Sequence, residues 1–128
     1  MSAERAPLAF VYDRCASRSK RHLDMRLIGC HTYADHKGWV LAGRWLDLGD
    51  AAVDCARPQL GELLAAMRAA APGREVLCLV HNWGRLAHDV QHRIAIQQRV
   101  AQAGGYSATT FDESDQRARM ALTGVRHA

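Results

Sequence analysis

The chain has 128 residues, of which 48% are hydrophobic and 23% are charged, the proportions of a single globular domain with one core. No apolar run approaches the roughly 20 residues that span a membrane, which argues against a membrane protein. The N-terminus also lacks the hydrophobic segment of a signal peptide, so we expect a cytoplasmic protein.

The net charge of +4 comes from arginine, because only Lys20 and Lys37 are lysines. Guanidinium groups bind phosphates in a bidentate way, which would suit nucleic acid, but codon bias in a GC-rich genome produces the same excess. Both explanations remain open. The cysteines are widely spaced, which predicts small buried hydrophobic residues rather than disulfides or a zinc site; they are Cys15, Cys30, Cys55 and Cys78.

The first half of the chain predicts two strands with a helix between them. The strands are expected over residues 8–12 and 39–46. The helix, over about residues 19–37, is indicated by apolar residues at helical spacing, namely Leu23, Leu27, Cys30 and Ala34. Gly38 is expected to end it.

The second half repeats this alternation. Pro58 begins a helix whose apolar face is Leu60, Leu63, Leu64 and Met67. The apolar run 76–80 predicts a strand buried on both faces, and residues 106–110 predict another. Between these strands lies a third helix, with an apolar face expected at Leu86, Val90, Ile94 and Ala101.

Strands that alternate with helices predict a three-layer α/β fold. We expect a mostly parallel sheet of four to five strands, with helices on both faces and the first strand in the interior. The chain reads as one domain over residues 1–128, with a core at about 8–111 and a polar tail or the start of a further helix at 112–128.

Polar residues follow the strands at the carboxyl edge of this sheet, where open α/β sheets place their sites. They are Arg14, Ser17, Asp47, Asp50, Arg85 and His88. Arg57 precedes Pro58 at a helix start, a position that attracts anions. A phosphate site is therefore expected, although Arg14 could instead pair with a nearby carboxylate, and Arg57 and Arg85 could be solvated.

The two histidines at positions 88 and 92 have the i, i+4 spacing that could hold zinc on a helix face. The motif lacks the usual acidic or cysteine partner. We therefore expect no metal and no cofactor.

Four short motifs follow one another along the chain in a characteristic order and spacing. They are Tyr12-Asp13-Arg14-Cys15-Ala16, Tyr33-Ala34 followed by Gly38-Trp39, Arg57-Pro58-Gln59-Leu60, and Arg85-Leu86. From about residue 8 to 110 the chain resembles the catalytic domain of the serine recombinases, that is, the resolvases, invertases and large serine integrases. In that family a serine attacks a DNA phosphodiester while arginines neutralise the scissile phosphate.

The resemblance implies catalytic positions at Arg14, Asp47, Arg57 and Arg85, and phosphate contacts from the three arginines and His88. Three other family positions are altered. Ala16 stands where the family has its nucleophilic serine, Gly84 replaces an aspartate, and His88 replaces an arginine. An alanine methyl cannot form a phosphoester. Ser17 is a substitute nucleophile only if a loop turns it, since neighbouring side chains of an extended segment point to opposite faces.

These observations predict a recombinase catalytic-domain homologue linked to site-specific DNA recombination but unable to cleave DNA. Two alternatives stay open: a regulatory or protein-interaction module that keeps the fold, and a residual recombinase that uses Ser17. The expected partner is DNA, bound weakly and without sequence preference, or a full-length recombinase; a homodimer is also open. The chain ends before the family's dimerisation helix, and we expect no separate DNA-binding domain.

Overall fold

The computed structural model describes residues 6–16, 20–49 and 57–123, and Ser17, Asp50 and Cys55 lie outside this part. The strands are β1 (Leu8–Cys15), β2 (Val40–Leu48), β3 (Val76–Val80) and β4 (Tyr106–Thr109). The helices are α1 (Lys20–Lys37), α3 (Pro58–Ala70), α4 (Val90–Gln102) and α5 (Arg119–Thr123), with short 3₁₀ turns at 71–73, 83–85 and 116–118.

The four strands form one sheet in the order β2-β1-β3-β4, and every strand pair is parallel. β1 therefore lies in the interior of the sheet, and every residue of β3 is buried. The predicted α/β fold and the interior position of the first strand are confirmed. Because the strands are parallel, β1, β2 and β3 end at the same edge.

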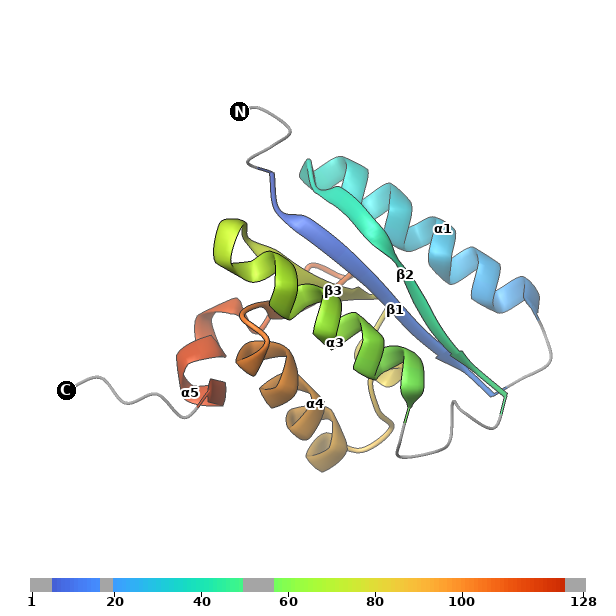
Figure 1. The fold of residues 1–128 in the computed structure, drawn as a ribbon. Helices are drawn as coiled ribbons and strands as arrows, with labels where there is room; N and C mark the ends of the chain where they lie inside the picture. Colours follow the sequence, from blue (N-terminus) through green and yellow to red (C-terminus); the bar gives the residue numbers. More distant parts are fainter. Residues whose placement is uncertain (1–5, 17–19, 50–56, 124–128) are drawn as a thin grey trace.

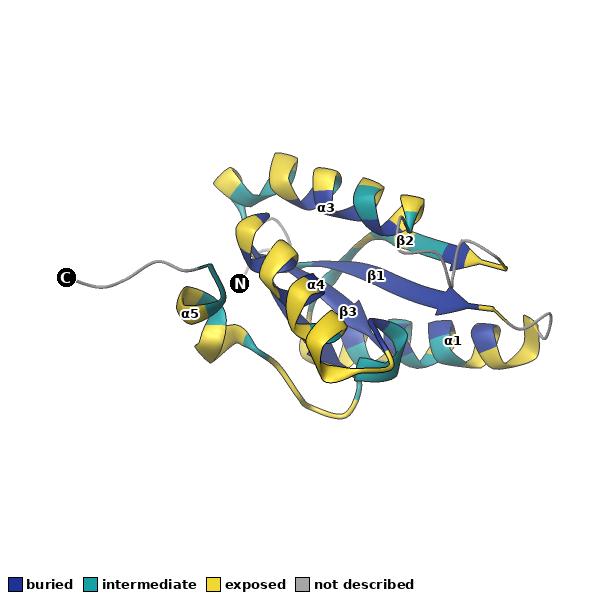
Figure 2. Cartoon of the chain, turned by 90° about the horizontal axis from the view of Figure 1, so that it is seen from below, coloured by how far each residue is buried: buried dark blue, intermediate teal, exposed yellow. Residues whose placement is uncertain are grey.

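Helices cover both faces of the sheet, α1 on one side and α3 with α4 on the other (Figures 1 and 2). The alternation of side chains along β1 separates two cores. Phe10 and Tyr12 pack against α3 and α4, whereas Ala9 and Val11 pack against α1. This alternation sends Arg14 and Asp13 to opposite faces of the sheet.

The predicted helices α1 and α3 are confirmed, including the buried faces expected for each. The predicted apolar face of the third helix is confirmed at Ala101, which is buried, but is wrong at Val90 and Ile94. That helix begins at Val90, which is 56% exposed, and Ile94 is 41% exposed. The buried face is Ile96, Gln97, Val100 and Ala101. Leu86 is buried, but it lies beyond the 3₁₀ turn at 83–85, and this turn breaks the helical phase that the prediction assumed.

After β4 the chain continues through the turn at 116–118 into α5, which packs against α4. Cys15, Cys30 and Cys78 are buried and form no disulfide, as expected of small hydrophobic residues. Burial raises the pKa of the Cys30 thiol to about 12. None of the helices in the described ranges is long and apolar enough to cross a membrane.

Gly105, at the turn into β4, has no room for a side chain. A Cβ at this position would lie 2.3 Å from Met67 Cε and 2.7 Å from the backbone oxygen of Val76. We predict that Gly105→Ala lowers the free energy of unfolding by about 1–3 kcal/mol through overpacking. Gly61, near the start of α3, has no atom within 4 Å of such a Cβ. Gly61→Ala should therefore stabilise the protein, by up to about 1 kcal/mol. Urea denaturation of both variants measures whether the free energy of unfolding falls in Gly105→Ala and rises in Gly61→Ala. Changes of the same sign in both variants would contradict the prediction.

Candidate functional site

The buried carboxylate of Asp47, near the end of β2, holds the start of α3. Its Oδ1 accepts the backbone N–H of Gln59 at 2.9 Å, and its Oδ2 accepts that of Leu60 at 3.1 Å. The Tyr12 hydroxyl donates to the same Oδ2 at 2.8 Å. Asp47 thus supplies the carboxylate that α3 needs at its N-terminus, and it ties β1, β2 and α3 together.

The residue at the N-cap itself is Arg57, as expected, and its backbone is strained. Its φ of 37° and ψ of 73° lie in the left-handed region, which a residue before proline rarely adopts. Such a conformation costs on the order of 1–3 kcal/mol and persists only where neighbouring contacts impose it. Here Asp47 fixes the helix start, and the Arg57 guanidinium donates to the backbone oxygen of Leu86. Arg57 therefore points from α3 across the gap toward the segment after β3.

Arg14 extends from the end of β1 toward the same segment. Its Nε and Nη2 donate to the backbone oxygen of Gly84 at 3.3 and 3.0 Å. The residue is only 7% exposed. Burial first, and then the nearby charges of Arg57 and Arg85, lower the pKa of the Arg14 guanidinium from its usual value. Arg57 and Arg85 are thus close enough to Arg14 for their positive charges to disfavour its charged form, a condition that a bound anion would relieve.

Arg85 belongs to this group but lies across the end of β1 rather than beside Arg57. Its Nη1 donates to the backbone oxygen of Arg14 at 3.1 Å and lies 4.0 Å from Asp13 Oδ1. Asp13 itself accepts two hydrogen bonds from Arg26 on α1, at 2.7 and 2.9 Å. The hydrogen bond to Asp13 raises the pKa of Arg26. Asp13 thereby counters charge on the α1 side of the sheet.

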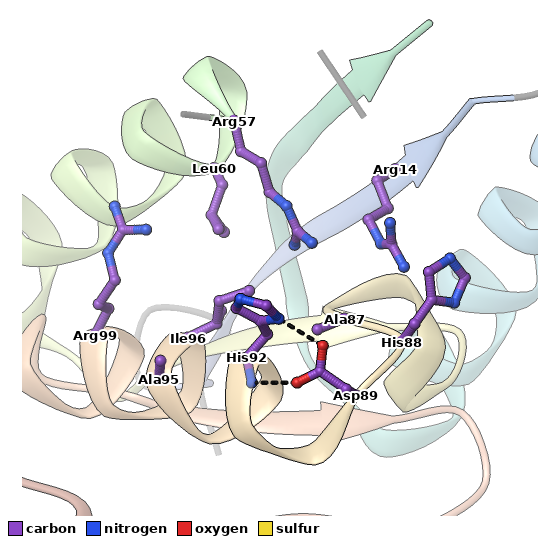
Figure 3. A pocket seen from close by; sticks show the side chains of 10 residues that line it. All are labelled: Arg14, Arg57, Leu60, Ala87, His88, Asp89, His92, Ala95, Ile96 and Arg99. Atoms are coloured by element: carbon purple, nitrogen blue, oxygen red, sulfur yellow. Dashed lines mark hydrogen bonds and ion pairs between the residues drawn. The ribbon is translucent and has the colours of Figure 1, made fainter. Parts of the chain in front are cut away.

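A cleft of about 350 Å³ opens between α3 and α4 (Figure 3). Arg14 and Arg57 lie at one end of it, together with His88. Arg99 extends from α4 near the other end, and His92 lies between them. Of the sequence-predicted residues, the cleft thus brings together Arg14, Arg57 and His88, while Asp47 and Arg85 support it from outside its lining.

The altered positions surround the same edge. Ala16 directly follows β1 and is exposed, Gly84 lies in the turn 83–85, and His88 is exposed on the segment before α4. A Cβ on Gly84 would lie 3.0 Å from Asn82 Oδ1, the end of a flexible side chain, so the turn can accept a larger residue. Ser17 lies outside the described residues. Within the described ranges, no group of three or more metal-binding side chains is present.

Sequence reasoning missed the contacts that organise this edge. Tyr12 was predicted only as the end of the first strand, yet its hydroxyl donates a hydrogen bond to Asp47, and burial first and then this contact raise the pKa of Tyr12. His92 and Arg99 share one face of α4 with Ile96 and line the cleft. The i, i+4, i+7 spacing of these three residues was the available signal. It was not recognised because the apolar face of the helix was misplaced.

Comparison with known proteins bears on this geometry. No protein-family model matches the sequence, and no curated protein matches it. Solved structures do match. The N-terminal catalytic domain of TP901-1 integrase superposes with a TM-score of 0.71 at 17% identity, over 91% of this chain and 88% of that one. This chain has the fold of a serine-recombinase catalytic domain.

Two further structures agree. The C-terminal catalytic domain of ISC1926 TnpA, an IS607-like serine recombinase, gives a TM-score of 0.65 at 18% identity, over 90% of this chain and 77% of that one. A resolvase-family site-specific recombinase from Streptococcus pneumoniae gives 0.68 at 15% identity, over 91% and 83%. The resolvase-like fold expected from the sequence motifs is therefore confirmed.

Asp47→Ala should destabilise this recombinase-like fold more than a surface change does. The substitution removes three hydrogen bonds and leaves the Tyr12 hydroxyl and the α3 amides without their acceptor. We predict a loss of about 3 kcal/mol in the free energy of unfolding. The matched control is Asp35→Ala, at an exposed position of α1, which should change it by no more than about 0.5 kcal/mol. Equal denaturation midpoints for the two variants would show that Asp47 does not hold the helix start.

Proposed function

We propose that this chain is a serine-recombinase catalytic-domain homologue that binds DNA phosphates in the context of site-specific recombination but does not cleave DNA. The observation that carries the proposal is the convergence of Arg14 and Arg57 on one cleft, while an alanine stands two residues after Arg14, where the family resemblance expects the nucleophile. Phosphoryl transfer needs positioned charge and a nucleophile. This edge of the sheet offers the charge, and Ala16 cannot offer the nucleophile.

The arrangement of the arginines supports phosphate binding over a solely structural role. Asp13 is engaged with Arg26 and Arg85, and Asp47 with Tyr12 and α3. Arg14 and Arg57 both face the cleft, and among the described residues its lining holds three arginines and one carboxylate, that of Asp89 (Figure 3). In this proposal Arg14 and Arg57 contact the phosphate, Arg85 and His88 flank it, and Asp47 positions Arg57.

The proposal places the protein in the cytoplasm with its DNA, as a single unit that acts alone, as a homodimer or beside a full-length recombinase. Binding through this site would show little sequence preference, because phosphate contacts carry little sequence information. A partner recovered from cells in the absence of nucleic acid would favour the alternative of a protein-interaction module.

Duplex DNA binding should be weak and should decrease steeply with salt, since each arginine–phosphate contact releases counterions. We predict that Arg57→Gln lowers the slope of log affinity against log salt by about 1. Arg68→Gln is the matched control. It makes the same charge change at an exposed position of α3, about 16 Å further along the helix. Fluorescence anisotropy between 25 and 200 mM salt, on the order of the range over which such contacts weaken, measures both slopes. Identical slopes for the two variants would remove Arg57 from the phosphate site.

Neither the wild type nor Ala16→Ser should cleave supercoiled DNA or form a covalent adduct. The single variant restores the hydroxyl, but Gly84 and His88 still replace a carboxylate and a permanently charged guanidinium. Loss of one charge-stabilising donor typically costs about 3 kcal/mol, or 10²–10³ in rate. The triple variant Ala16→Ser, Gly84→Asp, His88→Arg is the comparison most able to regain activity. Denaturing gels detect the adduct. An adduct from the wild type would point to Ser17, and efficient cleavage by Ala16→Ser alone would show that the other two changes are neutral.

A further inference from the structure

The cleft between α3 and α4 continues beyond the two arginines, and its composition changes along its length. At the arginine end it is basic. Its middle is walled by apolar side chains from both helices, Leu60 of α3 and Ile96 of α4, with Ala87 and Ala95 beside them. A bare phosphate or a duplex backbone would use the basic end and leave this apolar part empty.

Two side chains in the cleft have flat surfaces. The His92 ring is held by Asp89, whose Oδ2 lies 2.5 Å from His92 Nδ1 and whose Oδ1 accepts the His92 backbone N–H at 2.8 Å. Arg99 lies seven residues further along α4, about 11 Å along the helix axis, and its guanidinium extends toward α3 (Figure 3). Imidazole rings and guanidinium planes are surfaces on which unstacked bases lie in nucleic-acid-binding proteins.

We propose that this cleft binds one unstacked nucleotide, with its phosphate at Arg14 and Arg57 and its nucleoside between α3 and α4. The volume of about 350 Å³ is at the lower end of the range of small-ligand sites, which suits a single nucleotide. The inference rests on the proposed phosphate site and adds the ligand class. The nucleotide is either a free mononucleotide or the terminal nucleotide of a DNA strand, and both present the same chemistry.

Calorimetric titration of the full chain with three ligands tests the cleft separately from the phosphate site. The ligands are inorganic phosphate, ribose 5-phosphate and adenosine 5′-monophosphate. We expect the mononucleotide to bind at least roughly tenfold more tightly than ribose 5-phosphate, because base stacking contributes that much or more. Equal affinities for the three ligands would overturn the nucleotide inference and leave the phosphate site in place. Failure of all three, together with duplex DNA, would overturn both.

A variant that fills the cleft separates the nucleoside from the phosphate. Ala95→Phe places a ring in the middle of the cleft from an exposed position, and Gln98→Phe makes a comparable change on the same helix outside the lining. Ala95→Phe should reduce mononucleotide affinity to that of ribose 5-phosphate while phosphate affinity is kept, and Gln98→Phe should change neither. Arg99→Gln, also at an exposed position, should weaken the mononucleotide alone and serves if Ala95→Phe fails to fold. Full mononucleotide affinity in folded Ala95→Phe and Arg99→Gln would contradict the inference.

Titrations with two oligonucleotides, a 5′-phosphorylated single strand and a blunt duplex, distinguish a free nucleotide from the end of a DNA strand. A single strand with a 5′-phosphate that binds more tightly than the mononucleotide and than a blunt duplex identifies a strand end. A mononucleotide that binds more tightly than either identifies a free nucleotide. A blunt duplex that binds most tightly, with no effect of Ala95→Phe, would mean that no base enters the cleft.

Discussion

The Asp47 carboxylate is the contact on which the rest of the site depends. It accepts hydrogen bonds from the Tyr12 hydroxyl of β1 and from the first amides of α3, and it stands near the end of β2. Three elements that are distant in sequence are thereby held at one edge of the sheet. Because α3 starts where this carboxylate fixes it, Arg57 adopts a left-handed backbone and points toward Leu86. Loss of the Asp47 contact would therefore remove a main stabilising interaction of the strained Arg57 backbone.

The charges at this edge are sorted by the two faces of the sheet. Side-chain alternation along β1 sends Asp13 to α1, where Arg26 and Arg85 meet it, and sends Arg14 to the cleft beside Arg57. On one face Asp13 offsets part of the charge of Arg26 and Arg85, and on the other the arginines of the described cleft lining outnumber its one carboxylate, Asp89. Because of this excess of positive charge, we place the phosphate ligand on the α3–α4 face of the sheet, although arginines are present on both faces. Arg85 belongs to the Asp13 network, so it contacts the backbone at the end of β1 and does not line the cleft.

Much of the fold could be predicted because each core element has one dominant period. The run 76–80 and the apolar face of α3 leave few alternatives, and the motifs around Arg14 and Arg57 indicated the fold that the solved structures share. The face of α4 was predicted in the wrong phase, because the prediction included Leu86, which the turn at 83–85 separates from the helix. The strand pattern also predicts that Asp47 lies at the carboxyl edge of the sheet, but it does not predict which groups Asp47 contacts. That depends on a tyrosine 35 residues away in the chain, a contact that no local rule encodes.

The most direct test of a retained phosphate site is an NMR titration of the arginine Nε–Hε signals with dimethyl phosphate, a minimal phosphodiester. We predict saturable shifts of the Arg14 and Arg57 signals at one common dissociation constant, while Arg44 and Arg68, which are exposed elsewhere, shift little. Shifts of similar size at all four arginines, or none at Arg14 and Arg57, would contradict a site at the end of β1.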